Sequence, residues 1–124
     1  MIDELAIILT DIPVSLHLGV PRAERERPQT VLISLTMARR DPAPFGADAR
    51  LGDTIDYARV IAFLKEGLPA RGPFVLVETI AETVAAYARD LAGPDACVAV
   101  DVKKPSVLGK DGLVTVRLVR EGAR

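Results

Sequence analysis

Two charged residues lie beside apolar segments, where a carboxylate or an ammonium group could do chemistry. Glu78 falls in the first turn of an expected helix, whose apolar residues recur at helical spacing from Val77 to Leu91. The helix dipole favours a carboxylate there, but beside an apolar surface it must find hydrogen-bond donors or shift its pKa. Glu78 is therefore either an ordinary capping acid or a carboxylate that accepts two hydrogen bonds from a ligand with adjacent N–H groups.

The second charged residue is Lys104, at the end of an expected strand. It continues the alternation of Val98, Val100 and Val102, so its ammonium group should point toward the apolar side of the sheet, and Pro105 ends the strand. A lysine in this position either extends its ammonium group into water or donates a proton inside a partly dry pocket.

The remaining candidates are weaker when each is taken alone. Tyr57 heads an expected helix, and Glu24 lies in a run of charged residues that is normally solvated. His17 and Cys97 are the single histidine and the single cysteine of the chain, and we expect a half-buried strand residue and a small buried residue, respectively. One His and one Cys cannot supply the three or four ligands of a zinc site, and no Gly-rich phosphate loop follows a strand. The sequence therefore predicts no metal site.

Composition excludes several classes of partner. Sixteen basic and seventeen acidic residues give a net charge of -1 over 124 residues, and no segment concentrates the basic ones. Nucleic acid and anionic membrane are therefore not expected as partners. No apolar run approaches the length of a membrane span, and the start of the chain lacks the basic residues of a signal peptide. We expect a single domain over residues 1–124 and a cytoplasmic protein.

Hydrophobic periodicity predicts four strands and two helices. Residues 5–18 form an apolar strand in which Pro13 marks a bulge or an edge, and a charged connection leads to a clearly alternating strand over residues 30–38. A surface loop over residues 39–53 comes next. Asp56 caps the first helix after this loop, and the second helix ends at Gly93–Pro94. Two further strands follow, over residues 96–104 and 114–118, joined by a turn over residues 109–112.

This order indicates an α+β fold. Short connections within each strand pair favour antiparallel hairpins, and the two helices must cover one face of the sheet. A four-stranded sheet with one helical layer leaves two exposed edges, and such sheets commonly pair with copies of themselves. We therefore expect a homo-oligomer.

Four short motifs occur together, in an order and spacing that resemble the dihydroneopterin aldolase family of folate biosynthesis. The resemblance covers about residues 5–120, and it rests on Gly19 with Glu24 and Gln29, on Asp53-Thr54-Ile55-Asp56-Tyr57, on Val77-Glu78-Thr79-Ile80-Ala81-Glu82, and on Lys104-Pro105 with Gly109. The family often has an aromatic residue between the glycine and Glu24, whereas this chain has Pro21-Arg22-Ala23, which leaves the exact substrate open.

The resemblance implies the tunnelling fold, or T-fold: an antiparallel four-stranded sheet with two helices on one face, in the order ββααββ. It further implies that four copies join their sheets into a barrel and that two such rings stack into an octamer, with active sites between neighbouring subunits.

By the same resemblance, Glu78 would anchor the pterin ring, with Val77 and Val20 adding backbone contacts and Ile55 lying beside the ring. Lys104 would lie near N5 of the ring and Glu24 near the substrate side chain, while Tyr57 would reach in from the adjacent subunit. The implied catalytic residues are therefore Glu24, Tyr57 and Lys104, without a metal or a cofactor.

The implied reaction is the retro-aldol cleavage of 7,8-dihydroneopterin into 6-hydroxymethyl-7,8-dihydropterin and glycolaldehyde, alone or together with epimerisation at C2′. Two alternatives stay open. One is a dihydroneopterin triphosphate epimerase, in which Arg22, Arg25 or Arg27 would hold the phosphates. The other is a non-catalytic T-fold oligomer that binds a pterin or a purine.

Overall fold

The computed structural model describes residues 3–105 and 112–122, and the predicted turn over residues 109–112 lies largely outside them. The chain forms one antiparallel sheet in the order β1-β2-β3-β4, so the spatial order of the strands follows the sequence. The strands are β1 (Glu4–His17), β2 (Pro28–Arg40), β3 (Cys97–Lys104) and β4 (Val114–Arg120). The predicted α+β architecture with antiparallel strand pairs is confirmed.

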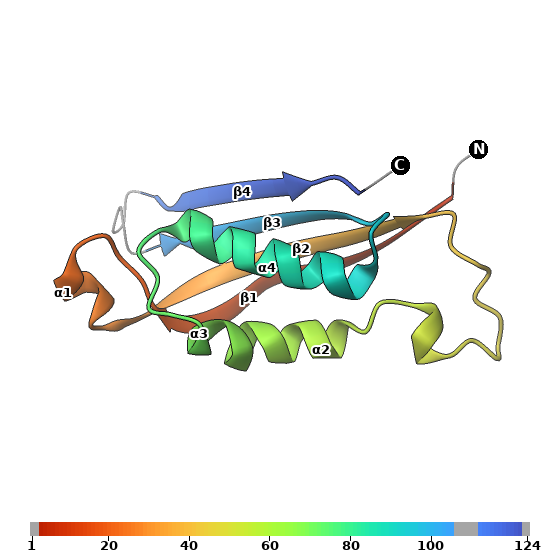
Figure 1. The fold of residues 1–124 in the computed structure, drawn as a ribbon, viewed down its shortest axis with the longest axis horizontal. Coiled ribbons are helices and arrows are strands. Elements are labelled where there is room, and N and C mark those ends of the chain that lie inside the picture. The colour runs from red at the N-terminus through yellow and green to blue at the C-terminus, as the bar shows by residue number, and fades with distance from the viewer. Residues whose placement is uncertain (1–2, 106–111, 123–124) are drawn as a thin grey trace.

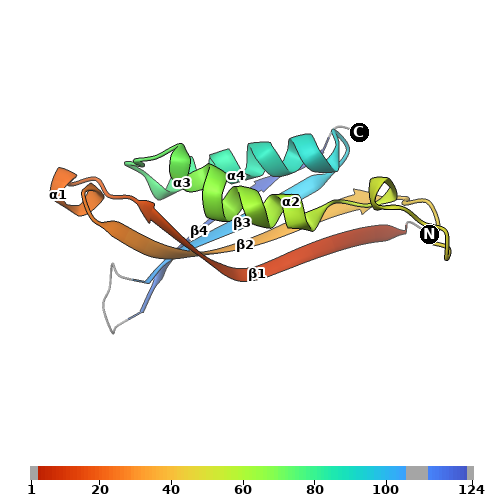
Figure 2. The same cartoon turned by 90° about the horizontal axis from the view of Figure 1, so that it is seen from below.

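The helices cover one face of this sheet (Figure 2). A continuous helical stretch consists of α2 (Tyr57–Ala62), a π-helical turn η2 (Phe63–Gly67) and α3 (Leu68–Ala70). The long helix α4 (Val77–Ala92) follows it and runs in the opposite direction across β3 and β4 (Figure 1). Within the described residues, no helix is both long and apolar enough to cross a membrane.

The predicted helix boundaries have identifiable causes. The Asp56 side chain accepts a hydrogen bond from the Arg59 backbone N–H at 3.3 Å, as a cap should. At the other end, Gly93 closes α4 with a φ of 108°, a conformation that glycine adopts without a Cβ penalty. Two short elements were not predicted, α1 (Arg22–Arg25) and a 3₁₀ turn η1 (Leu51–Asp53), because segments of three or four residues carry too little periodicity to detect.

The core lies between the sheet and the helices. Burial alternates strictly along β3, where each second residue is buried against the helical layer. The facing side chains are almost entirely aliphatic, as the low aromatic content requires. The core includes Val14, Leu16, Val31, Ile33, Leu35, Met37, Val60, Leu64, Leu68, Ile80, Val84, Val98, Val100 and Val102.

Strand β1 is an edge strand with a bulge between Leu9 and Ile12. Pro13 lies beyond the bulge and is paired with Leu32, so the expectation of an edge or bulge near this proline is confirmed. Asp11, inside the bulge, has a φ of 51°. A bulge leaves a residue out of the regular ladder, and aspartate tolerates this left-handed conformation better than most residues.

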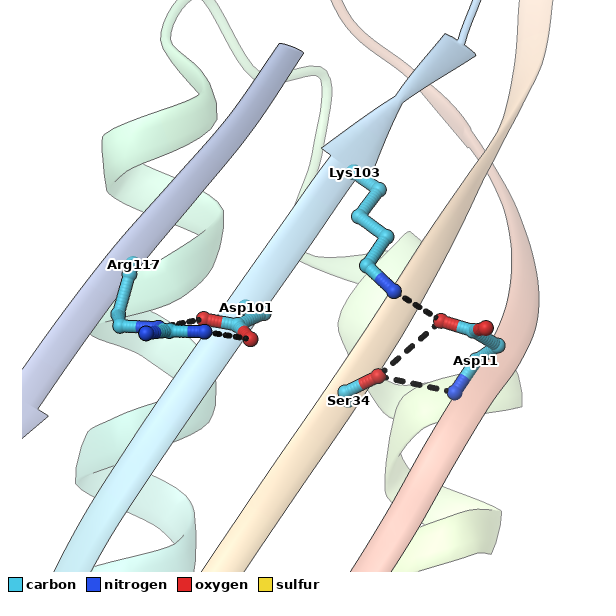
Figure 3. Close-up of polar contacts among 5 residues, drawn as sticks. All are labelled: Asp11, Ser34, Asp101, Lys103 and Arg117. Carbon is cyan, nitrogen blue, oxygen red and sulfur yellow. Dashed lines mark hydrogen bonds and ion pairs between the residues drawn. The ribbon is translucent and has the colours of Figure 1, made fainter. Parts of the chain in front are cut away.

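Polar side chains tie the strands together on the helix-free face (Figure 3). Lys103 donates to the Asp11 carboxylate at 2.6 Å, across β2, and the Asp11 N–H donates to Ser34 Oγ at 2.9 Å. Arg117 and Asp101 are directly opposite each other on β4 and β3, and they form a two-pronged ion pair with distances of 2.7 and 3.0 Å.

Cys97 begins β3 and is partly exposed, so the expectation of a buried cysteine is wrong.

The Asp101–Arg117 pair predicts how stability depends on pH. The hydrogen bond from Arg117, together with its charge, lowers the pKa of Asp101 below its ordinary value. A carboxyl group whose pKa is lower in the folded state stabilises that state at pH values above its pKa in the unfolded chain, which is about 3.9. This stabilisation is lost as the pH falls through the pKa of the folded state. We expect Asp101→Asn to lower the urea midpoint of unfolding at pH 7. At the most acidic pH, the midpoints of the variant and of wild type should be equal.

Arg117→Gln is the matched variant, because it removes the other half of the same pair. Urea denaturation from pH 7 downward should give both variants a flatter pH dependence than wild type. Parallel curves for wild type and Asp101→Asn would contradict the assignment.

Candidate active site

Lys104 is the last residue of β3, and its side chain turns toward the helix-covered side of the sheet. Among the described residues it is the one charged residue in the buried class, with 8% of its surface exposed. It continues the buried series of Val98, Val100 and Val102, as its position in the alternation predicts. An ammonium group removed from water in this way needs an anion or several acceptors close by.

Glu24 supplies that anion. The Lys104 ammonium group donates a hydrogen bond to Glu24 Oε1, and the two residues are 80 positions apart in the chain. The hydrogen bond from Lys104 is the main reason why the pKa of Glu24 is lowered, and Gln29 also contributes. The Glu24 side chain is 35% exposed, so the ion pair is open to solvent on the carboxylate side. Glu24 is therefore a specific partner of Lys104 rather than part of a solvated charge run.

The loop that carries Glu24 is fastened to the segment before α4. The Gly19 N–H donates to the Phe74 carbonyl at 3.0 Å, and the Phe74 N–H donates to the His17 carbonyl at 2.8 Å. These bonds flank a parallel bridge between Leu18 and Phe74. The Glu24 loop, the end of β3 and the start of α4 therefore meet at one end of the sheet (Figure 1).

Gly19 leaves room for the Glu24 side chain. Its φ is 151°, and a Cβ added at this position would lie 2.6–2.8 Å from the Cβ, Cγ and Cδ atoms of Glu24. Such distances are well inside van der Waals contact, so Glu24 can lie where it does because residue 19 has no side chain.

Gln29 also contacts Glu24, which its place in the sequence does not predict. Its side-chain Nε2 donates to the Leu18 carbonyl and lies 3.4 Å from Glu24 Oε1. The carboxylate of Glu24 thus has a lysine on one side and an amide on the other. The family resemblance groups Gly19, Glu24 and Gln29 in one motif, but it does not say what Gln29 contacts.

Glu78 lies in the first turn of α4 and is exposed. It lines a hollow of about 400 Å³ between α4 and β4, which we call the α4–β4 hollow, and its wall is formed by Glu78, Thr79, Ala81, Glu82, Val116, Arg117, Leu118 and Arg120. The preceding residue, Val77, is half-buried and packs against the core. A second hollow of about 430 Å³ lies farther along α4, and none of the predicted site residues is among those that line it.

The other predicted site residues do not all lie close to Lys104. Val20 is 65% exposed, in the loop that carries Glu24. Tyr57 is 54% exposed and begins α2, whereas Ile55 is buried in the core with 1% exposed. Because α2 runs opposite to α4, it begins at the end of the molecule away from α1 (Figure 1). The helical stretch from Tyr57 to Ala70 corresponds to about 20 Å of helix, so Tyr57 cannot reach Lys104 of its own chain.

His17 differs from its prediction. It is the last residue of β1 and is exposed rather than half-buried. Its Nδ1 donates to the Arg25 carbonyl at 2.7 Å, so it contacts the loop that carries Glu24.

Comparison with known proteins places these features in a family. The family model for dihydroneopterin aldolase, FolB, matches residues 7–119. A Chlamydia trachomatis protein named as a probable dihydroneopterin aldolase is 26% identical over 76 residues, which cover 61% of this chain and 60% of that protein. The match thus spans less than two thirds of the relative's length.

Solved structures agree in fold. A FolB crystal structure from Vibrio cholerae superposes with a TM-score of 0.78 at 26% identity, covering 94% of this chain and 96% of that one. The E. coli dihydroneopterin aldolase, crystallised in complex with neopterin, gives a TM-score of 0.74 at 22% identity, with 93% and 97% covered. The T-fold expected from the sequence is confirmed.

The contact between Gly19 and Glu24 leads to a prediction. In Gly19→Ala, the added Cβ should push the Glu24 side chain away from Lys104, because it would otherwise overlap three of its carbon atoms. We expect the pKa of Glu24 to rise toward its ordinary value, as measured by NMR titration of the labelled carboxyl carbon.

Gly52→Ala is the matched control, because a Cβ at residue 52 meets no atom within 4 Å. The pKa of Glu24 should stay at the wild-type value in this variant. An unchanged Glu24 pKa in Gly19→Ala would show that residue 19 does not hold the carboxylate in place.

Proposed function

The chain belongs to the dihydroneopterin aldolase family, and we propose that it cleaves 7,8-dihydroneopterin into 6-hydroxymethyl-7,8-dihydropterin and glycolaldehyde in folate biosynthesis. The observation that carries the proposal is the buried Lys104 ammonium group paired with Glu24. The pair places a proton donor and a proton acceptor in contact, at the end of the sheet where α4 begins.

A retro-aldol cleavage needs a group that accepts the electrons of the broken C–C bond. Lysine Schiff bases and zinc ions serve this purpose in other aldolases. In dihydroneopterin the ring itself can accept them, because protonation at N5 prepares the adjacent C=N bond to take the electron pair. We assign to Lys104 the delivery of the proton at N5. Glu24 would serve the hydroxyl groups of the side chain that is cleaved.

Glu78 is proposed as the anchor of the pterin ring. A carboxylate can accept parallel hydrogen bonds from the 2-amino group and N3–H of a pterin, which fixes the orientation of the ring as well as its position. The exposed position of Glu78 in the α4–β4 hollow supports this role, since a hollow of about 400 Å³ is within the usual range for small-molecule sites. Val77 and Val20 would contribute contacts through their backbone.

A complete site would require a second copy of the chain. Tyr57 begins α2 at the far end of the molecule, and β1 and β4 are both edge strands. Pairing β4 of one copy with β1 of the next would continue the sheet. We propose a tetramer or an octamer in which Tyr57 and the backbone of Ile55 from one subunit complete the site of its neighbour. The buried side chain of Ile55 leaves its backbone as the contact surface.

The unphosphorylated substrate is favoured over its triphosphate. Two of the three arginines that could hold phosphate are already engaged within the chain. Arg22 forms an ion pair with Glu26 at 3.4 Å, and Arg25 donates to two backbone carbonyls. A triphosphate would have to compete with Glu26 for Arg22, and Nη1 of Arg25 is already occupied.

Incubation of the metal-free protein with dihydroneopterin, followed by detection of 6-hydroxymethyl-7,8-dihydropterin, tests the activity directly. Parallel incubation with dihydroneopterin triphosphate tests the epimerase alternative. Pterin binding without release of glycolaldehyde would support a non-catalytic binding protein and overturn the proposal.

The two charged residues should affect different kinetic constants. We expect Lys104→Ala to lower kcat by about 10²- to 10⁴-fold with little change in pterin affinity, because a positioned proton donor typically contributes this much. We expect Glu78→Ala to weaken pterin binding by on the order of a hundredfold, because it removes charge-assisted hydrogen bonds. Single-turnover rates and fluorescence titration with neopterin separate the two effects.

Lys103→Ala is the matched control for the lysine. Lys103 adjoins Lys104 but points to the helix-free face, where it binds Asp11. Its replacement should leave kcat near that of wild type. Wild-type turnover in both Lys104→Ala and Glu78→Ala would show that the roles are wrongly assigned.

A further inference from the structure

The helix that carries Glu24 lacks the usual sources of stability. α1 lies wholly within the described residues, has four residues and buries none of their side chains. Its N-cap residue, Pro21, makes no side-chain cap hydrogen bond. Helices this short are not stable by themselves in water, so other contacts must fix the position of Glu24.

Arg25 supplies such contacts through its side chain. Its Nη1 donates to the Gly19 carbonyl at 3.0 Å and to the Val20 carbonyl at 2.7 Å. These two carbonyls belong to the start of the same loop, so the guanidinium group joins the end of α1 to the residues that precede it. A guanidinium group can serve both because its N–H donors are rigid and planar and carry positive charge.

Arg25 is also held through its backbone. Its carbonyl accepts the hydrogen bond from His17 Nδ1 at 2.7 Å, and His17 is the last residue of β1. The residue that follows Glu24 is therefore connected to β1 through its main chain and to the Gly19–Val20 turn through its side chain. Glu24 has little freedom to move away from Lys104 while both connections are intact.

We propose that Arg25 is a positioning residue for the reaction, which holds the loop of residues 19–25 so that the Glu24 carboxylate lies against the Lys104 ammonium group. In this role Arg25 acts through Glu24 rather than through a contact with substrate. This assignment rests on the proposed function, because the effect of Arg25 on catalysis depends on the role of Glu24. A displacement of about 1 Å in a reacting group can cost a factor on the order of a hundred in rate.

The test compares Arg25→Ala with wild type in the full-length protein. We expect kcat for dihydroneopterin to fall by about tenfold to a hundredfold. The affinity for neopterin should fall less than kcat, because Glu78 still holds the ring even if the contact with the Val20 backbone is disturbed. Arg25→Lys should recover part of kcat, since its ammonium group keeps the positive charge and N–H donors of Nη1 on a shorter, more flexible side chain. It also replaces Arg25→Ala as the test variant if circular dichroism shows that the alanine variant is unfolded.

Glu26→Ala is the control variant in the same segment. It removes the surface ion pair with Arg22, and both partners of that pair are largely exposed. Its kcat should stay at the wild-type value. A loss in Glu26→Ala equal to that in Arg25→Ala would overturn the proposal, because any disturbance of α1 would then suffice.

A double-mutant comparison distinguishes a positioning role from an independent one. If Arg25 acts through Glu24, Arg25→Ala should cost less than about twofold when it is introduced into Glu24→Gln, because the residue that it positions has already been altered. An equal loss in both backgrounds would overturn the proposal, as would wild-type kcat in Arg25→Ala.

Hydrogen exchange separates this proposal from the proposed function. Absence of dihydroneopterin cleavage by the wild-type protein would overturn the function. The positioning role would then be decided by amide exchange in residues 19–25, which should be faster in Arg25→Ala and unchanged in Glu26→Ala. Unchanged exchange in Arg25→Ala would show that Arg25 does not hold the loop.

Discussion

The ammonium group of Lys104 imposes the main constraint on this structure. The alternation of β3 turns it toward the helical layer, where an unpaired positive charge would be costly. Glu24 compensates this charge from a loop that begins where β1 ends. The path of that loop is therefore tied to the end of β3, although the two segments are far apart in the sequence.

The loop is in turn fixed by several small contacts rather than by a hydrophobic core of its own. Gly19 provides space, Gln29 touches the carboxylate, and the backbone of Phe74 joins the loop to the segment before α4. These contacts bring the Lys104–Glu24 pair near the first turn of α4, where Glu78 borders the α4–β4 hollow. The ion pair and the Glu78 carboxylate thus lie at the same end of the sheet, although neither Lys104 nor Glu24 is among the residues that line the hollow.

The same architecture is the basis for the proposed sites between subunits. A sheet with its strands in sequence order has two free edges, β1 and β4, and antiparallel helices place Tyr57 at the opposite end from Glu24. In the proposed oligomer, neighbouring copies would pair these edges. Tyr57 would then reach Lys104 only from a neighbouring copy.

The sequence by itself determined the elements and the direction of most side chains. Alternation with period two placed Lys104 on the buried face, helical spacing identified the apolar face of α4, and Asp56 and Gly93 marked helix boundaries. Only the tertiary structure decided that Glu24 is the partner of Lys104, that His17 is exposed and binds the Arg25 carbonyl, and that Arg25 bridges two carbonyls. Periodicity reports which face a residue occupies, because that depends on local backbone geometry. It does not report which residues meet, because a contact across 80 positions depends on the path of every loop between them.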